Sequence, residues 1–453
     1  MKLKILLIMA LAIVTSFAFA QDKDEAKKME KFPPYYACMT EPHAWFYGPL
    51  EESKKRFAIY KENGVDMIRV ELAWGVLEPE EGKWDVKHMM DYIKLAGEMD
   101  LKSKVILGVA MDPPNWFFEK HPDALQMDEV GNVSHFSMSY SFPELNKVVD
   151  EKNKQIISFL KEAGVWDYVI YLIPSFGPAG EPAYPHPWTM GGEEVYGAPK
   201  YWGYEPSAQK DFAKQMKTKY EDISTANKTW DTDFKTWEDV IILKPGEKPG
   251  TYWNDYLLWY RDRKRDFVKF EIENVMKNAP DKISLVYVPG TGFSQADWDD
   301  AVATAQGPWV VKMMCDSMDL MTTAIKSGAW LQYTGCENEP EVARLRKYLD
   351  DNGMADAVMW GENAGYYVCA KHPIELANII IRNRLYGLDY THAHFAFMPK
   401  EGTKMPDLDN WDFTGMEPGN VEPNPTIMGD LKTAIGMIRE QNNKIFASKN
   451  ETK

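Results

Sequence analysis

The sequence contains few of the residues that hold disulfide frameworks or metal ions. Its 453 residues include only four cysteines and eight histidines, and no CxxC or HExxH pattern occurs. This scarcity excludes a disulfide scaffold and gives no reason to expect a metal or another cofactor. We expect the cysteines to be mostly small, buried apolar residues: Cys38, Cys315, Cys336 and Cys369.

Positive charge is also in deficit. Lysines and arginines number 52 against 68 aspartates and glutamates, which gives a formal net charge of -16. A field of this sign repels phosphate backbones and anionic membranes, so nucleic acid is a poor candidate partner. Aromatic residues are abundant, with 16 Trp, 23 Tyr and 20 Phe. Because flat apolar rings suit sugars, the expected partner is an oligo- or polysaccharide.

Beyond the N-terminal stretch no apolar run is long enough to span a bilayer, so no stable membrane insertion is expected. Residues 1–20 combine Lys2 and Lys4 with an apolar run from Ile5 and a small-x-small end. They predict a signal peptide cleaved before Gln21, and therefore a secreted or periplasmic protein. An N-terminal membrane anchor is the alternative. The sequence does not indicate an oligomeric state.

Short β-rich runs alternate with amphipathic helical stretches from Phe32 onward. This alternation predicts a (β/α)8 TIM barrel as a single catalytic domain over residues 21–445, followed by a tail at 446–453. An open doubly wound sheet is the alternative, but no GxGxxG follows the first strand. The predicted strands are Tyr35 to Met39, Met67 to Leu72, Lys104 to Val109, Tyr168 to Ile173, Ser284 to Val288, Leu331 to Cys336, Ala357 to Trp360 and His392 to Met398.

Glycine follows several predicted helices, as at Gly64, Gly164 and Gly387, and suits the left-handed residue after a helix end. Long segments follow the third, fourth and fifth strands. Loops at this end of a barrel build substrate pockets, so we expect the pocket there. These segments run from Met111 to Pro143, from Pro174 to Pro206 and from Pro289 to Val310.

The strongest local signal is GPAGEPAYP, residues 177–185, directly after the fourth strand. Two glycines and three prolines fix the backbone around one carboxylate, Glu181. In an apolar, aromatic-lined mouth this carboxyl group would hold a proton near neutral pH, as a general acid must. The alternative is an ordinary turn with a solvated Glu181.

Three further acids end strands on the same face. Glu71 ends the second strand, Glu337 the sixth and Glu362 the seventh. Each alone could be an ion-pair partner. Together with Glu181 they place four acids at one mouth, and paired carboxylates with separated pKa values are the equipment for hydrolysing glycosidic bonds.

These motifs resemble those of the β-amylases. GPAGE followed by Tyr-Pro is similar to their catalytic-acid motif, and a Cys-containing strand ending in Glu and then GENA follow in the same order. The resemblance implies that Glu181 is the general acid and Glu337 the base that activates water, with Glu71 and Asn363 binding sugar. It implies inversion by single displacement, and we favour this assignment.

Other segments resemble the bacterial β-galactosidases of the large retaining barrel clan instead. They include MDPPNW at residues 111–116, which stands where β-amylases carry a Gly-rich lid, and WGVLEPEEGKWD at residues 74–85. This resemblance implies that Glu362 acts as a nucleophile. A third hypothesis is an exported sugar-binding protein without catalysis.

Beyond the catalytic pair Glu181 and Glu337, we expect acids, an amide and aromatic rings near the mouth to bind substrate. The candidates are Glu71, Trp74, Asp112, Trp116, Tyr184, Trp188, Phe293, Trp360, Glu362 and Asn363.

Overall fold

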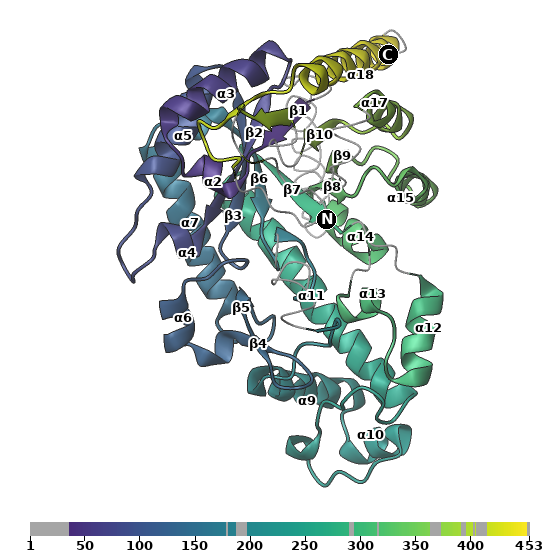
Figure 1. The fold of residues 1–453 in the computed structure, drawn as a ribbon. Coiled ribbons are helices and arrows are strands. Elements are labelled where there is room, and N and C mark those ends of the chain that lie inside the picture. Colours follow the sequence, from purple (N-terminus) through teal and green to yellow (C-terminus); the bar gives the residue numbers. More distant parts are fainter. Residues whose placement is uncertain are drawn as a thin grey trace, which may run out of the picture.

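Eight parallel strands form a closed barrel in the order β1-β10-β9-β8-β7-β6-β3-β2 (Figure 1). The strands are β1 (Tyr36–Thr40), β2 (Met67–Ala73), β3 (Lys102–Gly108), β6 (Val169–Pro174), β7 (Ile283–Val288), β8 (Trp330–Thr334), β9 (Met359–Glu362) and β10 (Gly387–Tyr390). This computed structural model describes residues 36–177, 180–186, 197–289, 294–314, 317–362, 373–390, 396–401, 404 and 415–450. The predicted (β/α)8 barrel is confirmed.

Helices surround the barrel because each buries one apolar face against it. In α7, for example, Leu145, Val149, Ile156 and Leu160 recur at helical spacing and are buried. The long helices are α3 (Leu50–Glu62), α5 (Lys87–Glu98), α7 (Leu145–Glu162), α9 (Pro206–Tyr220), α11 (Thr251–Asn278), α14 (Ser317–Lys326), α15 (Glu339–Asp351), α17 (Pro373–Arg382) and α18 (Pro425–Asn450). The predicted tail at 446–453 thus begins inside α18.

Shorter elements occupy the connections. The helices among them are α2 (His43–Phe46), α4 (Trp74–Leu77), α6 (Asn115–Lys120), α10 (Ile223–Trp230), α12 (Gln295–Thr304) and α13 (Trp309–Lys312). Two antiparallel pairs lie outside the barrel, formed by β4 (Leu125–Met127) with β5 (Val133–Met138) and by β11 (Phe397–Pro399) with β12 (Val421–Pro423).

The prediction for the eighth barrel strand was wrong. Its strand is β10, whereas Phe397 and Met398 of the predicted run belong to β11 and pair with β12. Gly387 had suggested a helix end, but α17 ends earlier, and Arg384 takes the left-handed conformation after it. Gly387 begins β10 instead, where a Cβ atom would collide with the Trp360 ring. Close packing, not a turn, requires this glycine.

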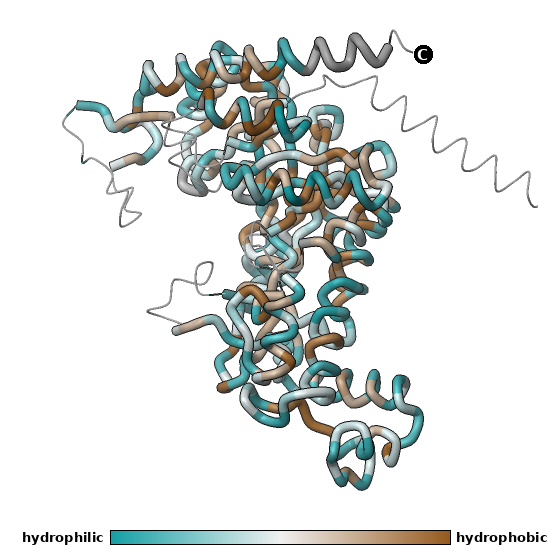
Figure 2. Tube along the Cα trace, turned by 90° about the vertical axis from the view of Figure 1, so that its right-hand side faces the viewer, coloured by the Kyte–Doolittle hydropathy of each residue, from teal (hydrophilic) through white to brown (hydrophobic). Residues whose placement is uncertain are grey.

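A helical extension follows the fourth barrel strand, beyond the long loop predicted from Pro174 to Pro206. Helices α9 and α10 lie at the end of the molecule remote from α18, and α11 runs from this extension back to the barrel (Figures 1 and 2). Aromatic rings fill the extension, including Trp230 stacked on Tyr252 with centroids 4.4 Å apart. Many of the rings that suggested sugar binding therefore form this second apolar core.

The described part of the chain shows the burial of two cysteines and the character of its helices. Cys38 and Cys336 are buried, as predicted, whereas Cys315 and Cys369 lie outside the described residues. The predicted signal peptide at 1–20 also lies outside them. Within the described ranges, no helix has both the length and the apolar character needed to cross a membrane, and no group of His, Cys, Asp and Glu could hold a metal ion.

A buried carboxyl group joins α7 to α11. Glu271 is fully buried, and Asn153 Nδ2 donates to its Oε2 at 2.9 Å. Burial raises the pKa of Glu271 to about 8, although the hydrogen bond from Asn153 opposes the rise. Because the folded protein keeps this proton while an unfolded glutamate loses it near pH 4.3, the wild type should lose stability progressively from about pH 4.5 to about pH 8.

Replacing Glu271 with glutamine should remove this pH dependence. We expect Glu271→Gln to match the wild type near pH 4 and to exceed it by several kcal/mol in free energy of unfolding at pH 8. Urea unfolding of both proteins from pH 4 to pH 9 measures the difference. Parallel stability curves across this range would contradict a protonated Glu271.

Candidate active site

The loop carrying Glu181 is a tight turn after β6. Gly177 N donates to the Glu181 carbonyl at 2.9 Å, and Gly180 N donates back to the Gly177 carbonyl at 3.0 Å. A Cβ atom on Gly177 would collide with the Ala183 carbonyl oxygen, and Gly180 has φ +78°. Only glycine fits both conditions without strain. The sequence therefore fixes the backbone on both sides of this carboxylate.

Aromatic contacts hold this loop against the helices beneath it. Tyr184 stacks on Tyr260 of α11 with ring centroids 3.7 Å apart, and its hydroxyl donates to the Tyr260 carbonyl at 2.8 Å. Tyr184 N donates to the Met313 carbonyl, and the Tyr140 hydroxyl donates to the Ala183 carbonyl at 3.2 Å. The position of Glu181 is thus tied to α11 and to the region after α13.

Glu181 holds its proton up to neutral pH. The residue keeps some solvent exposure, but burial of the carboxyl group, assisted by the negative charge of Glu362, raises its pKa to about 7, against an opposing hydrogen bond from Thr334. The sequence predicted this behaviour. A carboxyl group with this pKa can donate a proton at neutral pH and accept one in a later step.

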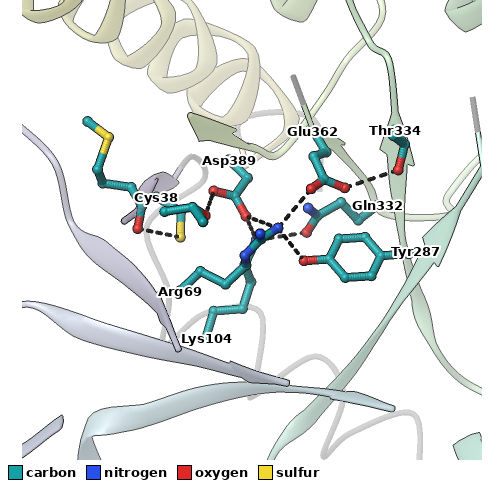
Figure 3. A network of polar contacts seen from close by, with 10 residues as sticks. Cys38, Arg69, Lys104, Tyr287, Gln332, Thr334, Glu362 and Asp389 are labelled. Carbon is teal, nitrogen blue, oxygen red and sulfur yellow. Dashed lines mark hydrogen bonds and ion pairs between the residues drawn. The ribbon is translucent and has the colours of Figure 1, made fainter. Parts of the chain in front are cut away.

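Glu362 lies at the end of β9, among side chains from neighbouring strands that face the barrel interior (Figure 3). In register it sits beside Thr334 of β8 and Asp389 of β10. The Thr334 hydroxyl donates to Glu362 Oε2 at 3.0 Å, and Arg69 Nη1 donates to Oε1 at 2.8 Å. Arg69 also donates to the Tyr287 hydroxyl at 2.9 Å. Two donors from different strands thus hold this carboxylate in place.

Glu337 belongs to the turn after β8 and is partly buried. Its charge acts on Tyr333, whose pKa is raised by burial first, then by Glu341 and Glu337, against the lowering effect of Arg344. Glu341 and Arg344 belong to α15. The charge of Glu337 thus acts on a residue that α15 also influences, whereas the charge of Glu362 acts on Glu181.

Glu71 of β2 and Asp112, which follows β3, both act on Tyr47. Burial raises the pKa of Tyr47 to about 12, and the charges of Glu71 and Asp112 add to the rise. Both acids are partly buried, and the Tyr47 ring is 40% exposed. An accessible ring with two acids beside it can contact a sugar, and the sugar-binding roles of Glu71 and Asp112 stay predictions.

Most of the aromatic candidates that the structure describes are covered by protein. Trp74 and Trp360 are fully buried, and Tyr184 is 3% exposed. Trp360 stacks with Tyr36 inside the barrel, and Trp116 is partly buried with its indole N–H donating to the Glu78 carbonyl. Buried rings offer no face to a sugar, so the predicted stacking by Trp74, Tyr184 and Trp360 is contradicted. Trp188, Phe293 and Asn363 lie outside the described residues.

Sequence reasoning missed three residues of this network: Arg69 and Thr334, which donate to Glu362, and Tyr287, which accepts from Arg69. A signal for one of them was present. Arg69 stands two positions before Glu71 on one strand, and residues two apart share a face of a strand. The other two contacts join different strands and could not be seen without the barrel's register.

Comparison with known proteins shows the family to which the chain belongs. Residues 41–306, more than half of the chain, match the family Glyco_hydro_42, described as β-galactosidase. The chain belongs to this family. Membership confirms the predicted resemblance and, at the level of the family, the prediction of a glycoside hydrolase.

Relatives of this family member include both enzyme classes that the motifs suggested. The chain is 24% identical over 236 residues to β-galactosidase BgaA of Clostridium cellulovorans, covering 50% of this chain and 33% of the relative. It is 25% identical over 232 residues to a β-amylase of Niallia circulans, covering 46% and 40%. The chain thus spans less than half the length of these relatives.

A solved structure carries the same fold over a larger share of the chain. The catalytic domain of the β-amylase from Paenibacillus polymyxa superposes with a TM-score of 0.65 at 19% identity, covering 80% of this chain and 93% of that one. At this identity the likeness shows the fold alone.

Proposed function

We propose that this protein is an exported glycoside hydrolase of oligo- or polysaccharides, with β-galactosides as the first substrate class, in which Glu181 and Glu362 are the catalytic pair. The observation that carries the proposal is their electrostatic contact: the charge of Glu362 raises the pKa of Glu181, and Thr334 hydrogen-bonds to both. Family membership supports the reaction, and the described β-galactosidase activity supports the substrate class.

The two carboxyl groups take different roles because their surroundings differ. Glu181, protonated to about pH 7, donates its proton to the glycosidic oxygen as the bond breaks. Glu362, held by Arg69 and Thr334, attacks the anomeric carbon. Glu181 then removes a proton from the water that hydrolyses the glycosyl ester, and thereby recovers its own proton.

The electrostatic contact between the carboxyl groups favours retention of configuration. The charge of Glu362 acts directly on Glu181, and Thr334, which donates to Glu362 Oε2 at 3.0 Å, also acts on Glu181, so both carboxyl groups border the same space. Retaining glycosidases have carboxyl groups ~5 to 5.5 Å apart, whereas inverting enzymes need ~6.5 to 9.5 Å to house a water. We therefore replace the inverting scheme, with Glu337 as base, by double displacement with Glu362 as nucleophile.

A proton NMR time course tests this stereochemistry. After a screen for sugar release from β-galactans, red-algal galactans and starch, the best substrate is hydrolysed in deuterated buffer. We expect the first anomer observed to keep the configuration of the cleaved bond, and the other anomer to grow later by mutarotation. Release of the opposite anomer first would reject Glu362 as nucleophile. Hydrolysis of starch alone would favour the β-amylase relatives as the guide to substrate.

Export remains part of the proposal. The charged start, apolar run and small-x-small end of residues 1–20 support cleavage before Gln21. Mass spectrometry of the protein recovered from its producing cells gives the N-terminal residue directly.

A further inference from the structure

Lys104 is a charged residue at the centre of the barrel that the proposed reaction does not use. Its side chain, on β3, is fully buried. Nζ donates to Asp389 Oδ2 at 2.7 Å and to Gln332 Oε1 at 2.8 Å, and it lies 4.9 Å from the centroid of the Trp360 ring (Figure 3). Burying an ammonium group is costly unless it is paired. Its retention here calls for a role.

Asp389 lies between two cations. Besides Lys104, Arg69 Nη1 is 3.7 Å from Asp389 Oδ2, and the Thr40 hydroxyl donates to Oδ1 at 2.6 Å. Burial alone would raise the pKa of Asp389, but the charges of Lys104 and Arg69 and the hydrogen bonds from Lys104 and Thr40 hold it below its ordinary value. Asp389 is therefore an anion that competes with Glu362 for Arg69.

Charge balance then assigns a role to Lys104. The described cluster holds two cations, Arg69 and Lys104, and two anions, Asp389 and Glu362. Without the lysine, Arg69 would face two buried carboxylates, and one of them would take up a proton more readily. With the lysine, Asp389 Oδ2 is paired with Nζ at 2.7 Å, closer than Arg69 Nη1 at 3.7 Å, and the guanidinium charge is left for Glu362.

We propose that Lys104 is a positioning residue for catalysis: by neutralising Asp389 it keeps Arg69 directed to Glu362 and so keeps the nucleophile ionised at acidic pH. This inference rests on the proposed function and deepens it. It also bears on the second step, because the same free guanidinium charge stabilises Glu362 as a leaving carboxylate when water attacks the glycosyl ester.

Other titratable groups face this cluster and must be held constant in any test. Burial and the charge of Glu362 raise the pKa values of Glu181 and Tyr287. The charge of Glu71 acts on Arg69, and that of Asp389 acts on Cys38. Because none of them is changed in the variants below, shifts between variants report on Lys104 and Asp389 alone.

The test compares pH profiles of kcat/KM for Lys104→Met, Asp389→Asn and the double variant. We expect Lys104→Met to move the acidic limb upward by about one pH unit, which corresponds to about a tenfold loss of kcat/KM at pH values well below the wild-type limb, with little loss at the optimum. Asp389→Asn should leave the limb at or below that of the wild type. The double variant removes both charges and should return the limb to the wild-type position, as a charge-balance role requires.

Lys102→Met is the matched control. Lys102 is on the same strand two residues away but is only partly buried, and it should leave the profile unchanged. An unmoved acidic limb in Lys104→Met, or a double variant that keeps the shifted limb, would overturn the inference. If Lys104→Met does not fold, an upward shift in Asp389→Asn would overturn it. Activity retained in Glu181→Gln and Glu362→Gln would instead remove the proposed function itself.

Discussion

Replacing Glu181 with glutamine is expected to lower kcat by ~10³-fold on substrates with a sugar leaving group, within the range of 10² to 10⁴ typical for loss of a general acid. Glutamine keeps the size and polarity of the side chain, and the loop is fixed by its glycines and by Tyr184, so folding should be intact. Substrates with a nitrophenolate leaving group need no protonation, and their first step should be nearly unchanged. An equal loss of kcat/KM, which reports the first step, on both substrates would argue against proton donation.

The pH profile gives a second readout of the same residue. Because Glu181 has a pKa of about 7 and acts in its protonated form, the kcat/KM of the wild type should fall above about pH 7. In Glu181→Gln this alkaline limb should disappear, since glutamine does not titrate. Steady-state rates from pH 4 to pH 9 on one natural substrate measure both limbs. An alkaline limb that persists in Glu181→Gln would belong to another group.

The second large effect distinguishes the catalytic role of Glu362 from that of Glu337, by comparing the kcat of their glutamine variants. Glu362→Gln should lower kcat by roughly 10⁴-fold or more, because the variant has no nucleophile. Glu337→Gln should remain within roughly tenfold of the wild type, because the charge of Glu337 acts on Tyr333 on the α15 side. Thermal unfolding of both variants controls for misfolding. The reverse ranking would restore Glu337 as the base of an inverting enzyme.

Rescue by azide distinguishes a nucleophilic role of Glu362 from any role of Glu337. In Glu362→Gly the small anion can occupy the space of the lost carboxylate and attack the anomeric carbon of a nitrophenyl glycoside, so a glycosyl azide of opposite configuration should accumulate. Glu337→Gly should give no such product. Mass spectrometry detects the azide adduct and NMR assigns its configuration.

The barrel could be predicted from the sequence because its signals are local. Seven of the eight strands stand out as short apolar runs between helical stretches, and each was placed within a few residues of its observed position. The eighth failed because GLDY is brief and begins with a glycine that resembles a helix end. Only the Trp360 ring on the neighbouring strand β9 shows why that glycine is there.

The catalytic pair could be predicted only in part, because the local sequence does not show which carboxylates from different strands face each other. Glu181 is marked by its own loop. Glu337 and Glu362 both follow apolar strands, but Glu362 is the last residue of β9, whereas Gly335 and Cys336 turn the chain before Glu337 is reached. The burial of Trp74 and Trp360 depends on neighbours distant in the chain, such as Tyr36.

The stack of Tyr184 on Tyr260 couples the acid loop to the rotation of a 28-residue helix. An α-helix turns by about 100° for each residue. A one-residue insertion within α11 ahead of Tyr260 would therefore swing that ring away from the loop, while an insertion before Thr251 would leave its azimuth unchanged. If the helical extension is replaced by another, the number of α11 residues before Tyr260 therefore matters more than the length of the linker before the helix.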